Sequence, residues 1–226
     1  MYKNIKLSAS LICANWLQLK NDLDELKKNN IDSLHIDIID GNFANDFTIG
    51  TSIIQNISNY TDIDLDYHLM IEEPNYYFDK IINPKSSTVS IHQECCKNLH
   101  REIINLKRMG IKKIGVALSP ATPIEYLEYI LEDINMVLLM TVNPEYTGQD
   151  LVAENIKKIK NLKNKISKLN LDIEIAIDGS VNKQSVSNMV SAGADVLILG
   201  SSGLFKKDLT ITNSLNEIYE EIDKIK

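Results

Sequence analysis

Short apolar runs recur along the chain and alternate with longer stretches in which hydrophobic residues follow the period of an α-helix. Short runs of this kind, bounded by polar and turn-forming residues, are typical of buried β-strands. They predict strands over residues 6–12, 33–40, 64–71, 88–93, 113–119, 136–142, 173–178 and 196–200.

The stretches between these runs have helical patterns. The clearest helices are expected over residues 16–29, 98–109, 155–169, 183–192 and 212–225. Within 155–169, the apolar residues at positions 156, 159, 162 and 166 share one helical face. Asn29-Asn30 and Gly110 follow helix ends, where residues in the left-handed conformation commonly terminate helices.

The order of the elements predicts the fold. Strands that alternate with helical segments along the whole chain indicate a parallel sheet, and eight such units indicate a single (β/α)8 TIM barrel. We expect one domain that spans residues 1–226. A doubly wound open sheet is the alternative, but it would more often carry a GxGxxG loop, which this sequence lacks.

The composition restricts the possible functions. The chain has 226 residues, of which 44% are hydrophobic, in keeping with the size and core of one barrel. The net charge of −7 and the lack of a basic patch argue against a nucleic-acid or acidic-membrane partner. No apolar run approaches the roughly 18 residues of a membrane span.

The cysteines and the N-terminal segment suggest a compartment. The three cysteines, Cys13, Cys95 and Cys96, are an odd number and fit no disulfide framework. The first residues of the chain lack the apolar core and cleavage site of a signal peptide. We therefore expect a cytoplasmic protein with reduced thiols.

Four residues near the ends of predicted strands indicate chemistry. They are His35 and Asp37 in one strand, His68 in the next, and Asp178 in the seventh. Because side chains alternate along a strand, His35 and Asp37 point the same way. Two imidazoles and two carboxylates predict a site for one divalent metal ion, and Zn, Mn, Fe(II) and Co suit them about equally.

The paired carboxylates suggest the reaction. An aspartate with an ordinary pKa of about 3.9 is too weak a base to remove a carbon-bound proton unaided. A cation supplies the missing driving force when it stabilises the enediolate that forms. With Asp37 and Asp178 on opposite faces of that planar species, one removes a proton and the other returns one. This two-base 1,1-proton transfer inverts the carbon, which favours epimerisation over hydrolysis.

Small residues follow the last two strands, where barrels commonly bind phosphate. They are Gly179-Ser180 and Gly200-Ser201. Small residues let backbone N–H groups approach an oxyanion, and a helix N-terminus adds a favourable dipole. These positions predict a phosphate group on the substrate.

Several motifs resemble one family along nearly the full chain. They are SASLICANW, HIDIIDGNF, HLMIEEP, IDGSVN and AGADVLILGSS, and together they are similar to those of the ribulose-phosphate 3-epimerase family. The resemblance implies an isomerase of carbohydrate metabolism with the barrel fold. It also implies metal-dependent proton transfer at C3 of a ketose phosphate, and a homo-oligomer, either a dimer or a hexamer.

The resemblance also implies roles for individual residues. Asp37 and Asp178 would be the acid/base pair, and the metal ligands would be His35, Asp37, His68 and Asp178. We expect His92 to support the site rather than to react. The residues expected to bind substrate are Ser10, His68, Tyr146, Gly148, Gly179, Ser180, Gly200 and Ser201.

The sequence leaves two pairs of sugar phosphates as candidate substrates. Ser180 in DGSxN and the segment GSSGLF resemble the branch of the family that interconverts D-allulose 6-phosphate and D-fructose 6-phosphate, which we expect here. The alternative is the pair D-ribulose 5-phosphate and D-xylulose 5-phosphate. Glu145 and Thr147 replace glycines that are usual in the family, so a catalytically silent sugar-phosphate-binding barrel is a third alternative.

Overall fold

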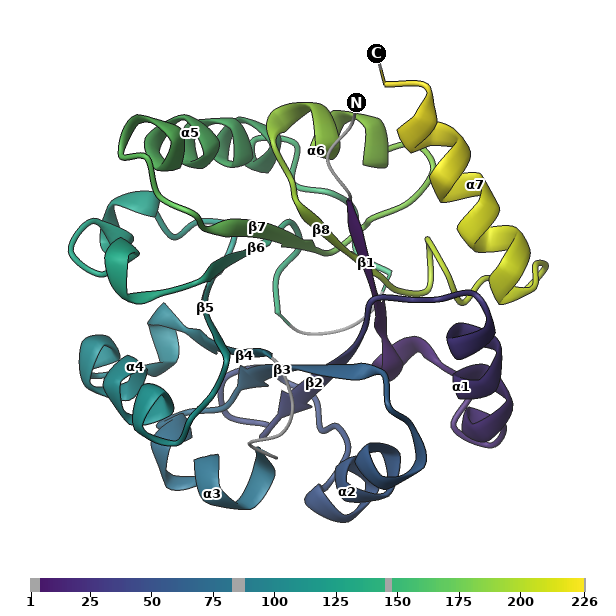
Figure 1. The fold of residues 1–226 in the computed structure, drawn as a ribbon, viewed down its shortest axis with the longest axis horizontal. Coiled ribbons are helices and arrows are strands. Elements are labelled where there is room, and N and C mark those ends of the chain that lie inside the picture. The colour runs from purple at the N-terminus through teal and green to yellow at the C-terminus, as the bar shows by residue number, and fades with distance from the viewer. Residues whose placement is uncertain (1–4, 83–87, 145–147, 226) are drawn as a thin grey trace.

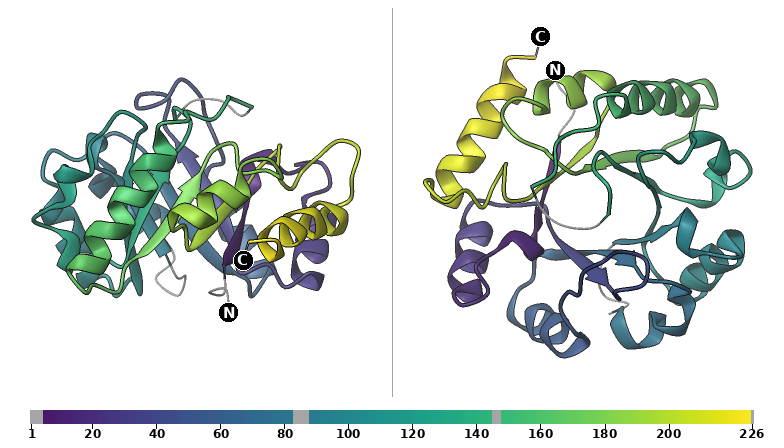
Figure 2. Two further views of the ribbon diagram at one scale, coloured as in Figure 1. Left: turned by 90° about the horizontal axis from the view of Figure 1, so that it is seen from above. Right: turned by 180° about the vertical axis from the view of Figure 1, so that it is seen from behind.

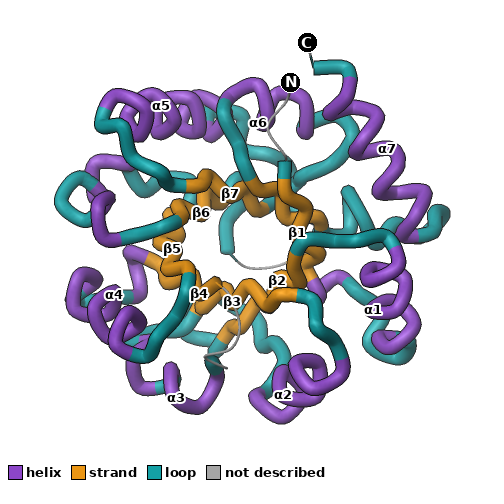
Figure 3. Tube along the Cα trace, in the orientation of Figure 1, coloured by secondary structure: helices purple, strands orange, loops and turns teal. Residues whose placement is uncertain are grey.

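The strands form a closed parallel barrel. The computed structural model describes residues 5–82, 88–144 and 148–225. Within them, neighbouring strands pair in chain order and the last strand closes the ring on the first (Figure 3). The strands are β1 (Lys6–Ser10), β2 (Ser33–Ile39), β3 (Asp64–Met70), β4 (Thr88–His92), β5 (Lys113–Leu118), β6 (Met136–Met140), β7 (Glu174–Asp178) and β8 (Val196–Leu199). The predicted TIM barrel is confirmed.

Helices surround the ring of strands, as Figure 1 shows. Along α5, Ile159, Leu162 and Ile166 are buried, so the predicted apolar face is the one that packs on the barrel. No helix of the described residues is long and apolar enough to cross a membrane. The α-helices are α1 (Leu19–Lys28), α2 (Thr51–Tyr60), α3 (Phe78–Ile81), α4 (Leu99–Arg108), α5 (Asn155–Lys168), α6 (Val186–Ala192) and α7 (Ile211–Asp223).

Two segments differ in detail from the sequence-based expectation. The first strand ends at Ser10, and Leu11–Cys13 form a 3-10 helix instead of continuing it. Between β5 and β6, the described chain forms two 3-10 helices, η4 (Ile124–Leu127) and η5 (Leu131–Asp133), in place of an α-helix.

Strand alternation along β2 separates apolar side chains that face the helices from polar side chains that face the interior. Along β2, Leu34, Ile36 and Ile38 belong to the hydrophobic core between strands and helices. The residues between them, His35 and Asp37, are also buried and point into the barrel. Figure 2 shows the barrel from the side, with the helices packed along its wall. Apolar packing therefore holds the wall, and the interior contains both these polar groups and a separate apolar cluster that includes Leu138, Ala176 and Ile198.

The N-terminal end of the barrel is closed by an ion cluster. Lys6, Lys113 and Glu174 are the first residues of β1, β5 and β7. Both lysine Nζ atoms lie 2.6 Å from the Glu174 carboxylate. Burial would raise the pKa of Glu174, but the hydrogen bonds from Lys113 and Lys6 outweigh it and lower the pKa. Because these strands are not neighbours in the ring, the ion pairs cross the barrel floor.

Candidate active site

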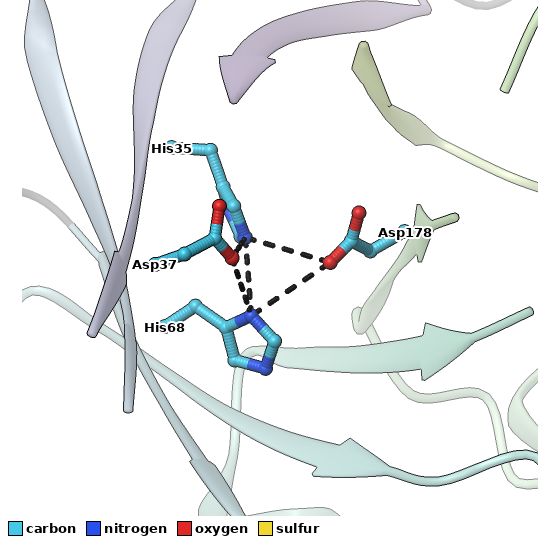
Figure 4. A group of neighbouring side chains, drawn as sticks. All are labelled: His35, Asp37, His68 and Asp178. Atoms are coloured by element: carbon cyan, nitrogen blue, oxygen red, sulfur yellow. Dashed lines mark hydrogen bonds and ion pairs between the residues drawn. The ribbon is translucent and has the colours of Figure 1, made fainter. Parts of the chain in front are cut away.

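The structure brings the four predicted ligand residues together at the opposite end of the barrel. One nitrogen or oxygen atom from each of His35, Asp37, His68 and Asp178 lies within 4.8 Å of the others. Figure 4 shows the carboxylates of Asp37 and Asp178 on opposite sides of the two imidazoles. Three strands that are distant in the sequence supply this cluster.

The spacing of these atoms fits a cation. The His68 Nδ1 atom lies 3.1 Å from Asp37 Oδ1 and 3.7 Å from Asp178 Oδ2. The His35 Nε2 atom lies 3.3 Å from Asp37 Oδ1 and 3.9 Å from Asp178 Oδ2. Ligands about 2.1 Å from a tetrahedral ion lie about 3.4 Å from one another. The four side chains could therefore hold one divalent ion with only small movements.

Hydrogen bonds orient two members of the cluster. His35 Nδ1 lies 2.7 Å from Asp66 Oδ2, which directs His35 Nε2 toward the other ligands. The Ser10 hydroxyl donates to Asp37 Oδ2 at 2.8 Å and leaves Oδ1 facing the histidines. Sequence reasoning missed Asp66. Its position two residues before His68 places it on the same strand face, and that spacing was the available signal.

The two aspartates have opposite pKa shifts. Burial would raise the pKa of Asp37, but the charge of His35 and the close contacts of the Asp37 carboxylate with His35 Nε2 and His68 Nδ1 outweigh it and lower the pKa. Burial and the nearby charge of Asp37 raise the pKa of Asp178 to about 6. The arrangement therefore favours one ionised and one protonated carboxyl, the states that a base and an acid need.

A cavity of about 260 Å³ opens above the cluster. Asp37 and Asp178 both reach it, whereas His68 is fully buried beneath them. Tyr146, predicted to bind substrate, lies outside the described residues, as do Glu145 and Thr147. The other predicted substrate-binding residues that line the cavity are Ser10, Gly148, Gly179, Ser180, Gly200 and Ser201.

The backbone after β7 forms a tight turn at the cavity. Gly179 has a φ of 108°, and a Cβ atom there would lie 2.9 Å from the backbone nitrogen of Val142. Ser180 has a φ of 49°, which is uncommon for a residue with a side chain. The Ser180 hydroxyl donates to the Gln149 carbonyl at 2.6 Å. This bond ties the turn to the loop after β6, and together they build one wall of the cavity.

Comparisons with known proteins agree with this geometry. A sequence model described as the ribulose-phosphate 3 epimerase family matches residues 6–205. The chain is 39% identical to "Ribulose-phosphate 3-epimerase" of Bacillus subtilis (strain 168) over 199 residues, 88% of this chain and 91% of the relative. It is 34% identical to "Ribulose-phosphate 3-epimerase" of Methanocaldococcus jannaschii over 204 residues, 90% of this chain and 86% of the relative.

Solved structures support the fold at a greater distance. The 3-hexulose-6-phosphate synthase of Salmonella typhimurium superposes with a TM-score of 0.65 and 18% identity, covering 98% of this chain and all of that one. This likeness concerns the barrel alone. The family match covers most of the chain, and both relatives named above are more than 30% identical to it over most of their length. The chain therefore belongs to the ribulose-phosphate 3-epimerase family, and it is an isomerase of the epimerase type.

Proposed function

We propose that this protein is a metal-dependent ketose-phosphate 3-epimerase that acts by two-base proton transfer through an enediolate. The observation that carries the proposal is the pair of aspartates, Asp37 and Asp178, on opposite sides of the cluster. Both line the cavity, and their pKa values are shifted in opposite directions. A pair of this kind has the two protonation states that inversion of a carbon requires.

The ionised carboxylate of Asp37 removes the C3 proton from one face of the substrate. The protonated carboxyl of Asp178 delivers a proton to the opposite face, and the two roles exchange in the reverse direction. The hydroxyl of Ser10 holds Asp37 in the orientation that this transfer needs. His35, Asp37, His68 and Asp178 would hold a divalent ion, which would supply Lewis-acid stabilisation of the negative charge that develops on the substrate.

Backbone groups after β7 and β8 are proposed to bind the phosphate. Gly179, Gly200 and Ser201 line the cavity next to Asp178, and glycine lets the backbone approach an anion closely. Gly148 reaches the same cavity from the loop after β6. His68 would hold the ion, and because it is buried beneath the cavity, its predicted contact with the substrate would be indirect. Tyr146 stays a candidate for closing over the sugar.

The names of the relatives favour a pentulose substrate. The relatives from Bacillus subtilis and Methanocaldococcus jannaschii are both named ribulose-phosphate 3-epimerase, which supports D-ribulose 5-phosphate and D-xylulose 5-phosphate as the substrate pair. A specific feature keeps D-allulose 6-phosphate and D-fructose 6-phosphate as the second candidate. Ser180 lines the phosphate end of the cavity with a side chain where the pentulose enzymes usually have glycine.

Proton NMR in heavy water tests both the reaction and the substrate. We expect deuterium to appear at C3 of the preferred ketose phosphate, with the second sugar turned over more slowly. Ser180→Gly should shift the ratio of the two rates if Ser180 selects the hexulose, whereas an unchanged ratio removes that role. Binding of both sugars without any exchange at C3 would establish the catalytically silent alternative.

The cellular context follows from the same proposal. We expect a cytoplasmic protein whose partner is a small ketose phosphate. We also expect a homo-oligomer, a dimer or a hexamer. Light scattering coupled to size-exclusion chromatography measures the mass of the particle, and a mass of about one chain would contradict this expectation.

A further inference from the structure

The predicted ligand His68 has a second polar contact on the side of its ring that faces away from the cluster. His68 Nδ1 faces the carboxylates, while His68 Nε2 lies 2.9 Å from His92 Nε2. Both imidazoles are fully buried. Their ring centroids are 5.0 Å apart and their planes differ by 27°, so the two ring edges face each other. One of these two nitrogens must carry a proton and the other must accept it.

The chain of contacts continues to a carboxylate with two donors of its own. His92 Nδ1 lies 3.1 Å from Glu94 Oε2. The other oxygen, Glu94 Oε1, accepts from the backbone N–H of Ser119 at 2.8 Å and from the hydroxyl of Thr122. An ionised carboxylate only accepts, and a backbone N–H only donates. The direction of every bond at Glu94 is therefore fixed.

The direction of the bonds at Glu94 determines the direction of the bonds that lead back to the cluster. Because Glu94 only accepts, the proton of His92 is on Nδ1, and His92 Nε2 is left to accept. His68 must then carry its proton on Nε2, which leaves the lone pair of Nδ1 free for a metal ion. We infer that Glu94, acting through His92, sets the tautomer of His68, so that Glu94 and His92 are positioning residues of the metal site. The inference rests on the proposed function in that a divalent ion occupies the cluster.

The second histidine of the cluster offers a matched comparison. His35 Nδ1 bonds to Asp66 directly, at 2.7 Å. The other oxygen of Asp66, Oδ1, has no hydrogen-bond partner among the described residues. An amide at position 66 can therefore turn its oxygen toward His35 and keep the same tautomer. An amide at position 94 cannot, because Ser119 N–H requires an oxygen on its side.

The experiment compares Glu94→Gln with Asp66→Asn and Glu94→Ala. In Glu94→Gln, the amide oxygen faces Ser119 and the NH₂ group donates to His92 Nδ1. This reverses the chain and leaves a proton on the ligand atom of His68. We expect zinc affinity, measured by competition with a chromophoric chelator, to fall about 10–100-fold in Glu94→Gln. Glu94→Ala and Asp66→Asn should each lose only a few-fold, because neither imposes the wrong tautomer.

Long-range ¹H–¹⁵N spectra of protein labelled at histidine give a readout that is independent of turnover. Zinc-loaded wild type should show His92 protonated at Nδ1 and His68 at Nε2. Metal-free Glu94→Gln should show His92 protonated at Nε2. The exposed His100 provides a reference signal.

Two results would overturn the inference. One is a His92 proton on Nε2 in the zinc-loaded wild type. The other is a zinc affinity of Glu94→Gln that is no lower than those of Glu94→Ala and Asp66→Asn. Failure of the proposed function would give a different result. Wild type would then bind zinc with the stated tautomers and still exchange no proton at C3.

Discussion

Both ends of the barrel gather carboxylates, but only the N-terminal end pairs them with lysines. At the N-terminal end, Glu174 lies 2.6 Å from each of two lysines. At the C-terminal end, Asp37 and Asp178 have histidine neighbours and no lysine or arginine ion pair within the described part of the chain. The pKa of Glu174 is lowered, whereas that of Asp178 is raised to about 6.

The difference indicates that the charges at the N-terminal end have a structural role and those at the C-terminal end a chemical one. Paired charges at the floor satisfy each other and hold the strand starts together. Buried acids without a lysine or arginine partner are unfavourable unless a charged histidine, an ion or a proton neutralises them, and such groups gather at functional sites. This contrast supports the proposal that the C-terminal end is the reactive end, in line with the general behaviour of TIM barrels.

Removal of the metal should have the largest effect on activity and stability. This effect should depend on the C-terminal cluster and not on the ion pairs at the N-terminal end. Treatment with a chelator should abolish epimerisation, and zinc or manganese should restore it. Zinc at 100 times its dissociation constant should stabilise the protein by about 2.7 kcal/mol, or roughly 5–10 °C in Tm. Differential scanning fluorimetry measures the shift. Glu174→Gln is the matched control and should respond equally to zinc. A Tm that does not change with zinc in wild type would contradict the proposed site.

Loss of one acid should have the next largest effect. Asp178→Asn should lower turnover and deuterium incorporation at C3 by about 10²–10⁴-fold, the usual contribution of a general acid or base. Metal-free Asp178→Asn should be at least as stable as metal-free wild type, because the charged form of Asp178 is unfavourable in its buried setting. Proton NMR measures the exchange. Exchange at the wild-type rate would remove Asp178 from its role.

The pH dependence of stability should distinguish the same two ends. A raised pKa means that the folded state binds the proton of Asp178 more tightly than the unfolded state does. The stability from this group is present below about pH 4 and is lost as pH rises through about 6. Metal-free wild type should therefore lose up to about 3 kcal/mol relative to Asp178→Asn between pH 4 and pH 7.

Urea unfolding at several pH values measures this difference. Glu174 has a lowered pKa, so its contribution has the opposite sign and is lost as pH falls below its unfolded value. Glu174 is present in both proteins and its contribution cancels in the comparison. A stability difference that stays constant across this range would show that the Asp178 carboxyl is not shifted as described.

The smallest effect is expected at the barrel floor. Glu174→Gln removes the negative charge between Lys6 and Lys113, all of which are partly exposed. Partly exposed ion pairs contribute little, so the free energy of unfolding should fall by about 1–2 kcal/mol, with turnover unchanged. Thermal unfolding and the epimerase assay measure the two quantities. A large loss of turnover in this variant would break the proposed division between the two ends.

The sequence by itself determined the barrel and the four residues that cluster at its C-terminal end. Hydrophobic periodicity located the strands, because each strand carries its own alternation and its own boundaries. Once the strands were located, the sequence also indicated the cluster of His35, Asp37, His68 and Asp178. Polar side chains near the C-terminal ends of barrel strands must lie near one another, because all these strand ends meet at one end of the barrel. The type of helix after β5 was not predicted from the sequence, because its two short 3-10 helices depend on local packing.

Only the tertiary structure decided which buried acids pair with lysine and which do not. The lysines that pair with Glu174 come from β1 and β5, which lie far from it in the sequence. The contact between His68 and His92 depends on the register of β3 and β4, in which His68 lies opposite Ser90. Register and barrel stagger are properties of strand pairs, and the pattern of a single strand does not specify them. For that reason Asp66 and Glu94 gain their roles only once the barrel is closed.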